Sequence, residues 1–223
     1  YDGQGWHLRK GAHLTLPQTL PQLVVDRVSH LSRELGEAAE VAEVARLLSV
    51  LGAYFGHSLA ESYFLHLNRP ELIGRLDTIV GTLVHGGILR RVSGREAGYT
   101  FEHHLMQEVL VEQARLVSHA QEIHVAAARA METVAGGSGS YAADTGFLSD
   151  VATHWEAGGD QGRAVEARIR GAKTAERGLD LESARSLYRQ VEEELERSGD
   201  RSPRRSAVQL SLAALYIRVG ELG

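Results

Sequence analysis

The chain has 223 residues, a length that suits one large domain or two small ones. Its composition, 43% hydrophobic and 24% charged, is typical of a globular protein that can bury a core. The net charge of −5 argues against general binding to nucleic acid, which needs a basic surface, and the absence of cysteine excludes disulfides, thiolate catalysis and cysteine-based zinc sites.

Residues 1–21 are predicted to form an extended arm or strand that leads from an upstream domain. Apolar and polar residues partly alternate over 5–17, and Pro17 and Pro21 prevent a helix from running through them. The opening residues lack the apolar region typical of a signal peptide, and no apolar run approaches the roughly 18 residues of a membrane helix. We therefore expect a cytoplasmic location and no membrane partner. Because the chain begins without Met, we also expect a fragment of a longer protein.

Residues 22–135 are predicted to form a winged-helix-like domain with closing helices. Apolar spacing predicts helices over 22–31, 36–52, 58–67, 70–87, 102–117 and 119–135, and two runs typical of β-structure predict strands over 88–92 and 99–102. Gly52 is expected to end the second helix, and Ser58 to cap the third. Three helices followed by a β-hairpin is the layout of a winged helix.

The glycine- and serine-rich segment 136–146 predicts a linker and a domain boundary. Residues 147–223 then read as truncated tetratricopeptide-like repeats, which are short helices separated by glycine- and aspartate-bearing turns. The predicted fold class is therefore mainly α, with a winged-helix domain that contains a small β-hairpin, followed by tetratricopeptide-like helical hairpins.

Small and large residues at alternating helical positions support these repeats, because small residues let paired helices approach and an aromatic side chain fills the groove. The residues concerned are Ala172, Ala175, Ala184 and Tyr188. Ala213 and Tyr216 repeat the pattern, but Ala213 lies 41 residues after Ala172, further than the roughly 34 residues of this repeat. We therefore expect elongated hairpins.

The last predicted helix, near 206–220, carries a broad apolar surface. We expect Leu212, Leu215, Tyr216 and Val219 to form an interaction face, because the chain stops where the next repeat helix would begin. This face would serve self-association or a protein partner. The alternative is that the helix folds back onto its own hairpin and buries the face.

Two adjacent histidines in the stretch "GYTFEHHLMQEV" raise the question of a metal or acid–base site. On a helix, His104 and Glu108 lie on one face, and His103 and Gln107 form a second such pair. A zinc site needs three or four ligands, and no further ligand is evident nearby. We interpret the histidines as helix-start residues, one of them buried and hydrogen-bonded, and keep a metal site and a proton-transfer site as alternatives.

The dipeptide Lys173-Thr174 raises the question of a phosphate-binding loop. Such a loop needs two glycines that let backbone amides surround the phosphates, and Ala172 occupies the position of the second one, directly before the lysine. The segment also reads as a continuous helix. We therefore predict no nucleotide binding here and no cofactor in this segment.

A winged helix also raises the question of DNA recognition by its third helix, over 71–86. This helix has a mixed charge, from Glu71, Arg75, Asp77 and His85, and the hairpin adds Arg90, Arg91 and Arg95. These residues would contact a few phosphates at most. Nucleic acid is therefore an unlikely partner, and packing against a neighbouring domain fits better. A DNA-binding transcription regulator is the alternative function.

Several motifs resemble the segment after the ATPase core in STAND-type signalling ATPases, which include actinobacterial adenylate or guanylate cyclase-like proteins and large LuxR-type regulators. The matches are Phe101, His103 and Leu105 to a Phe-Arg-His-x-Leu motif, Ile123-His124 to a Leu-His pair, and His154 to an Ala-His motif that opens the helical repeats. Glu102 replaces the family's arginine. The resemblance covers nearly the whole chain.

The resemblance implies a regulatory and interaction segment that is not itself an enzyme. It would couple the nucleotide state of an upstream ATPase core to a protein or peptide partner bound by the helical repeats. ATP and Mg²⁺ are then expected only in that upstream domain. The residues that match the family's motifs would have structural roles, and His103 is expected to be a hydrogen-bonding residue at the start of a helix.

Overall fold

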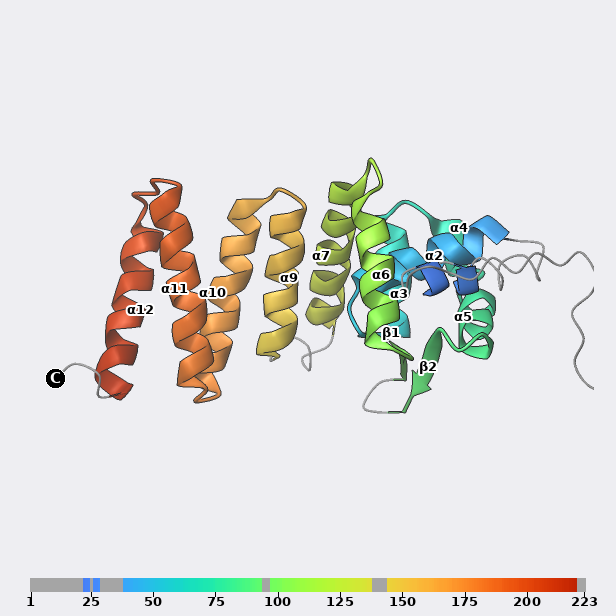
Figure 1. The fold of residues 1–223 in the computed structure, drawn as a ribbon. Helices are drawn as coiled ribbons and strands as arrows, with labels where there is room; N and C mark the ends of the chain where they lie inside the picture. The colour runs from blue at the N-terminus through green and yellow to red at the C-terminus, as the bar shows by residue number, and fades with distance from the viewer. Residues whose placement is uncertain (1–21, 25, 29–37, 94–96, 138–143, 220–223) are drawn as a thin grey trace, which may run out of the picture.

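The computed structural model describes residues 22–24, 26–28, 38–93, 97–137 and 144–219. These residues are mainly helical and include one small antiparallel sheet, which confirms the predicted mainly α class at this level. Figure 1 shows a bundle of helices around the sheet, and a row of helices that leads away from the bundle to the C-terminal end. The arm predicted over 1–21 lies outside the described residues. Within the described ranges, no helix is long and apolar enough to cross a membrane.

Besides the helical residues 22–24 and 26–28, the bundle contains six helices and three strands among the described residues. They are α2 (Ala38–Val50), β1 (Tyr54–Gly56), α3 (His57–His66), α4 (Pro70–Ile73), α5 (Leu76–His85), β2 (Leu89–Val92), β3 (Gly98–Phe101), α6 (His104–Arg115) and α7 (Ala120–Gly137). The strand order is β1-β3-β2, and both pairs are antiparallel. Helix α2 packs against α5, α6 and α7, and α7 also packs along α3. Residues 22–24 and 26–28 are helical, as predicted.

The predicted hairpin is present, but the sheet has a third strand that the sequence did not indicate. Strand β1 is only three residues long and pairs with β3, with Phe55 opposite Tyr99 and Gly56 opposite Gly98. A Cβ atom on Gly98 would lie 2.7 Å from the Phe55 carbonyl oxygen and 2.7 Å from the Tyr54 ring. The close pairing of β1 with β3 therefore requires glycine at position 98.

Two predictions about helix ends in the bundle are wrong. Helix α3 begins at His57 with Gly56 at its N-cap, so Ser58 lies inside the helix and does not cap it. The helix predicted over 70–87 is two helices, because α4 ends at Gly74 and α5 begins at Leu76. Glycine has a low helix propensity, so a break at Gly74 costs little.

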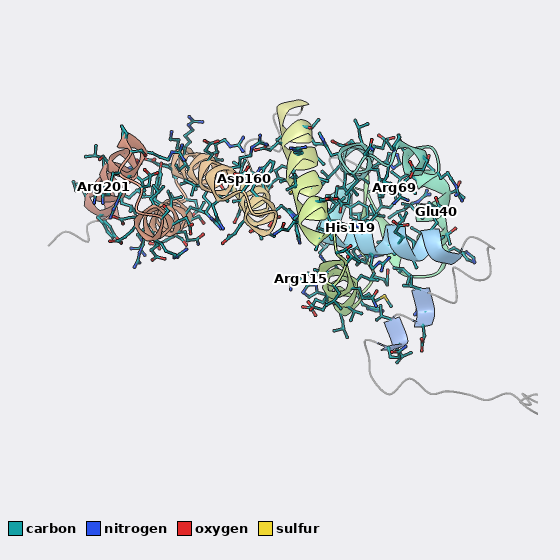
Figure 2. All side chains as sticks on the ribbon, turned by 90° about the horizontal axis from the view of Figure 1, so that it is seen from above. Glu40, Arg69, Arg115, His119, Asp160 and Arg201 are labelled. Carbon is teal, nitrogen blue, oxygen red and sulfur yellow. The ribbon has the colours of Figure 1, made fainter. Side chains whose placement is uncertain are left out.

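Four helices form the row after the bundle: α9 (Thr145–Ala157), α10 (Gln161–Arg177), α11 (Leu181–Arg197) and α12 (Pro203–Val219). The packed pairs are α7 with α9, α9 with α10, α10 with α11, and α11 with α12. In Figure 2, seen from above, Asp160 and Arg201 lie at turns along this row. Each helix therefore packs on the one before it in the chain.

The turns between these helices repeat every 20 residues. In each turn the residue before an aspartate has a left-handed backbone, with φ of +83° at Gly159, +61° at Leu179 and +67° at Gly199. The aspartate amide then donates to a carbonyl five residues earlier, and all three of these bonds are 2.9 Å long. They run from Asp160 to Trp155, from Asp180 to Ala175 and from Asp200 to Leu195. This is the Schellman arrangement, which satisfies carbonyls at the end of a helix.

The same three aspartates begin the next helix or turn. The side chains of Asp160 and Asp180 accept from the amides of Arg163 and Ser183 at 3.0 and 3.1 Å, so each caps a helix N-terminus. Since α10 and α11 have 17 residues each, two helices with their turns repeat after 40 residues. This period places the buried Leu212 at the position of Ala172, whereas Ala213, which the sequence pattern aligned with Ala172, is exposed.

The hydrophobic core does not stop at the predicted linker. One cluster of buried side chains runs from Val24 to Ala167 and includes Val151 and Trp155 of α9. Gly136 and Gly137 are the last residues of α7, and α9 begins at Thr145. The predicted boundary at 136–146 therefore falls within one continuous core. A second cluster fills the space between α10, α11 and α12.

The interaction face predicted on the last helix needs correction. Leu212 and Leu215 are buried with Val208 in the second cluster, and Tyr216 packs against that cluster. These positions lie three or four residues apart and face α11, so the helix folds back onto its own hairpin. The exposed large apolar side chains of α12 are instead Leu210 and Ile217, at 72% and 67% exposure. The side chain of Val219 lies outside the described part.

The repeated turn predicts opposite effects for two substitutions. Leu179 adopts the left-handed conformation with a 73% exposed side chain, so Leu179→Gly should stabilise the protein by roughly 0.5–1 kcal/mol. Gly199→Ala should destabilise it by about 1 kcal/mol, since no atom lies within 4 Å of an added Cβ and only the backbone is strained. Urea unfolding measures both changes in the free energy of unfolding, provided that the m-values of the variants equal that of the parent chain. A loss of stability in Leu179→Gly would show that the leucine side chain outweighs the backbone strain.

Candidate functional site

The paired histidines at the start of α6 do not form a site in the described structure. His103 is the N-cap residue and is exposed, and its side chain caps no amide. His104 Nε2 lies 3.3 Å from Glu108 Oε1, with both side chains more than half exposed. Gln107 donates to the Ser49 carbonyl at 3.1 Å and so joins α6 to α2. The prediction that one histidine is buried and hydrogen-bonded is therefore wrong, because this end of α6 faces solvent.

The other residues of the Phe-x-His-x-Leu motif lie at the edge of the bundle. Phe101 is buried at the end of β3, with its ring centroid 6.3 Å from that of Phe55. Leu105 is 41% exposed. His103 and Leu105 line an apolar cavity of about 410 Å³ with Leu23, Val24, Arg27 and Met106. Arg27 donates to the Gly86 carbonyl from Nε and Nη2, which holds the first helical residues against the end of α5.

The structure brings two other motif residues together, although they lie 30 positions apart in the chain. His124 on α7 and His154 on α9 share a hydrogen bond, with their Nδ1 atoms 3.0 Å apart. The ring centroids are 5.2 Å apart and the rings are tilted by 34°. Neutral imidazole has one donor and one acceptor nitrogen, so one ring donates its Nδ1–H and the other accepts. The pair therefore joins α7 to α9 while both rings are neutral.

Burial controls the charge of this pair. His154 is only 8% exposed, and its burial, with the neighbouring His124, lowers its pKa from 6.5 to about 4. Burial and the positive charge of Arg115 also lower the pKa of His124. Among the described residues, no group of three or more His, Asp or Glu side chains could hold a metal ion. The His124–His154 pair is therefore a polar contact within an apolar interface.

Close packing holds the helices together near the histidines. A Cβ atom on Gly158, just after α9, would lie 2.7 Å from Val125 Cγ2 and 3.3 Å from the Val125 backbone nitrogen. Glycine therefore allows the end of α9 to approach the backbone of α7. Trp155 is 1% exposed in the same interface, with the Arg163 guanidinium 4.5 Å from the centre of its ring.

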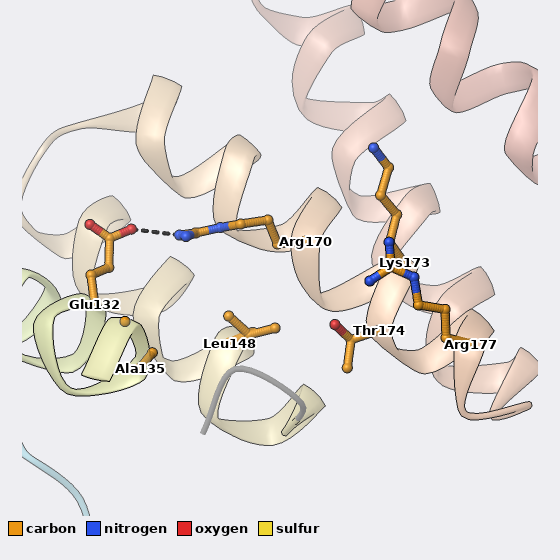
Figure 3. A pocket seen from close by; sticks show the side chains of 8 residues that line it. Glu132, Ala135, Leu148, Arg170, Lys173, Thr174 and Arg177 are labelled. Atoms are coloured by element: carbon orange, nitrogen blue, oxygen red, sulfur yellow. Dashed lines mark hydrogen bonds and ion pairs between the residues drawn. The ribbon is translucent and has the colours of Figure 1, made fainter. Parts of the chain in front are cut away.

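A groove lies further along the same helices, between the C-terminal half of α7 and α10. One part of it, the basic cavity, has a volume of about 330 Å³. Its lining residues are Glu132, Ala135 and Gly136 of α7, Leu148 of α9, and Arg170, Lys173, Thr174 and Arg177 of α10. Figure 3 shows Arg170 reaching from α10 toward Glu132 on α7, and their side chains form an ion pair at 2.5 Å. Lys173 and Arg177 have no ion-pair partner among the described residues.

The other part of the groove, the balanced cavity, has a volume of about 590 Å³. Its lining residues are Glu132, Arg163, Glu166, Ile169 and Arg170. Two cations and two anions therefore face this cavity. The basic cavity has three cations and one anion, an excess of two positive charges on a chain whose net charge is −5. The two cavities share Glu132 and Arg170, so this ion pair lies between them.

The sequence contained part of the signal for the basic cavity. Arg170, Lys173 and Arg177 are spaced by three and four residues, and this spacing places them on one face of a helix. Residues 161–177 are a continuous helix in the structure, as predicted, so Lys173 and Thr174 lie on a helix and not in a phosphate-binding loop. The role of Glu132 had no sequence signal, because it lies 38 residues before its partner.

No family model, curated protein or solved structure matches the chain. The structural features that bear on function are therefore the groove and the histidine pair.

The histidine pair predicts that stability depends on pH. The folded-state pKa of His154, about 4, lies below its unfolded value of 6.5, so the unfolded chain binds a proton first as the pH falls. The stability that the neutral, buried His154 gives the folded protein is therefore complete above pH 6.5 and is lost as the pH falls from 6.5 to 4. Between pH 7 and 5, the free energy of unfolding should fall by about 2 kcal/mol more in the parent chain than in His154→Gln.

Urea unfolding at each pH measures this difference, and the exposed His104→Gln serves as the control. The control should keep the pH dependence of the parent chain. Equal losses of stability in the parent chain and in His154→Gln would contradict a buried neutral pair.

Proposed function

We propose that the chain is a regulatory and interaction segment of a multidomain signalling ATPase, as its resemblance to STAND-type proteins implies. The row of helices binds an acidic segment of a partner protein in the groove between α7 and α10. The bundle packs against an upstream ATPase core and passes the state of its nucleotide to the row through α7. The segment is not itself an enzyme, and ATP and Mg²⁺ belong to the upstream core.

The excess of positive charge in the basic cavity is the observation that carries the proposal. Lys173 and Arg177 line a concave surface and have no ion-pair partner among the described residues. Long-range attraction between such a surface and an acidic segment speeds association and selects partners by charge. A row of helices suits this role, because its groove is formed by side chains from several helices and can hold an extended peptide.

The order of elements in the bundle supports a winged-helix interpretation. Strand β1 lies between α2 and α3, and the β2–β3 hairpin follows α5, so that all three strands form one sheet. The hairpins formed by α9 with α10 and α11 with α12 support a tetratricopeptide-like interpretation, with helices longer than that repeat usually has. Both assignments are part of the proposal.

We do not propose a DNA-binding regulator, because α5 is poor in cations and two basic residues near it, Arg75 and Arg90, have acidic partners. Helix α5 contains no lysine or arginine. Arg75, at its N-cap, forms an ion pair with Glu40 on α2. Arg90 on β2 lies 3.5 Å from Glu102, and its positive charge is therefore partly compensated. Cations that are already paired with carboxylates contribute less to DNA binding, because binding depends on cations that neutralise phosphates.

The proposed groove predicts charge-selective peptide binding. A fluorescent glutamate-rich peptide should bind the chain, and a lysine-rich peptide of equal length should not, as measured by fluorescence anisotropy. Charge reversal by Lys173→Glu with Arg177→Glu should weaken binding at least about tenfold, because it replaces two attractive charges by two repulsive ones. The control reverses Arg189 and Arg201, which are exposed residues away from the groove, and should change the affinity less than about twofold.

Equal binding of the two peptides, or equal losses in the two reversed variants, would show that the groove does not select acidic partners. Circular dichroism spectra should be the same for both variants, so that a loss of affinity reflects charge and not unfolding.

The bundle predicts that duplex DNA is not a specific partner. At about 0.15 M salt the chain should not retard a DNA duplex in the presence of competitor DNA, because too few unpaired cations lie near α5 and β2. A gel-shift titration measures this. A complex that survives competitor and is lost in Arg90→Glu with Arg91→Glu would contradict the proposal and favour the DNA-binding alternative.

A further inference from the structure

The uncompensated charge of the basic cavity, two positive charges, matches in magnitude the two negative charges of a dianion. Glu132 compensates Arg170, and Lys173 and Arg177 remain as two uncompensated positive charges. A phosphate monoester carries about −1.5 to −2 charges at neutral pH, whereas a carboxylate carries −1. The guanidinium of Arg177 can donate two parallel hydrogen bonds to phosphate oxygens, and the ammonium of Lys173 acts as a point charge.

The hydroxyl of Thr174 adds a donor to the same cavity. The hydroxyls of Thr82, Thr133 and Thr153, which also lie on helices, donate to the carbonyl four residues earlier at 3.1, 2.8 and 3.1 Å. Thr174 makes no hydrogen bond of this kind to the described residues. Figure 3 shows Thr174 on α10 opposite Leu148 on α9, below the Arg170–Glu132 pair in this view. The Thr174 hydroxyl is therefore available to donate to a bound oxygen atom.

The remaining wall of the cavity suits a small carbon group. Ala135, Gly136 and Leu148 also line the cavity and contribute apolar surface. The volume of about 330 Å³ lies at the lower end of the range for small-ligand sites. The balanced cavity is larger, but its charges cancel, so it offers no comparable attraction for an anion.

We propose that the basic cavity binds a phosphate monoester. Lys173 and Arg177 hold the phosphate, Thr174 donates a hydrogen bond to it, and Leu148 packs against the ester carbon atoms. The monoester can belong to a phosphorylated side chain or to a small metabolite, since both present the same group. The inference rests on the proposed function, because the basic cavity is part of the groove assigned to the partner.

The test uses the full chain and two probes that differ only in what carries the phosphate. Phenyl phosphate represents a small molecule, and a blocked glycine–phosphoserine–glycine peptide represents a phosphorylated side chain. Amide chemical shifts are followed during titration, with phenol and the unphosphorylated peptide as controls. Saturable shifts at the basic cavity, for the phosphorylated probes alone, are expected. Tighter binding of the peptide assigns the monoester to a protein, and tighter binding of phenyl phosphate assigns it to a small molecule.

Four variants test the individual roles. Lys173→Gln and Arg177→Gln should each weaken binding about threefold or more, because each removes one charge from an exposed site. Glu132→Gln should strengthen binding by about threefold, because it releases Arg170 toward the cavity. Arg189→Gln removes the same charge from an exposed position away from the groove and should leave the affinity unchanged. Thermal unfolding of each variant checks that the fold is intact, since last-turn cations also stabilise the α10 C-terminus.

Three outcomes would overturn the inference: shifts that do not saturate, equal shifts from the unphosphorylated controls, or an equal loss of affinity in Arg189→Gln and Lys173→Gln. The proposed function can then be judged separately. If the glutamate-rich peptide still binds in a manner that depends on Lys173 and Arg177, the phosphate site is wrong but the acidic-partner groove stands. If neither ligand binds, both proposals are wrong.

Discussion

The packing of α7 between the bundle and the row is the constraint on which the rest of the structure depends. Helix α7 contacts α3 on one side and α9 on the other. Its buried residues are mainly alanines, and Ala127, Ala128 and Ala130 are completely buried. Small side chains allow backbones to approach closely, so neighbouring helices meet α7 at short range and with little freedom to slide. The position of every later helix follows from this one, because each packs on the one before it.

The two candidate functional features lie at opposite ends of this helix. His124, near its start, joins α9 through His154, and Glu132, near its end, joins α10 through Arg170. The groove exists only because α7 and α10 are both held by α9. A change in how α9 packs on α7 would therefore alter the distance between Glu132 and Arg170, and with it the charge that the groove presents.

Turn-forming residues and apolar spacing made most of the helices predictable from the sequence. Contacts between residues far apart in the chain could not be predicted in this way. Glycine and aspartate marked the turns of the row, but the left-handed Leu179 hid their 20-residue repeat, since leucine is rarely found in that conformation. The three-residue β1 is too short to show an alternating pattern and exists through its pairing with β3. The face of the last helix was assigned wrongly because apolar spacing does not say which side meets a neighbour. His124 and His154 were each singled out, but their contact depends on the packing of α7 on α9.

Amide hydrogen exchange tests most directly whether α7 couples the bundle and the row into one unit. Val151→Ala, in the buried interface of α9, should lower the opening free energy of α9 by roughly 1–3 kcal/mol. If α7 joins α9 to the bundle, the amides of α3, which pack on the far side of α7, should lose protection by the same amount. Loss of protection confined to α9 and the later helices, with α3 unchanged, would contradict the coupling.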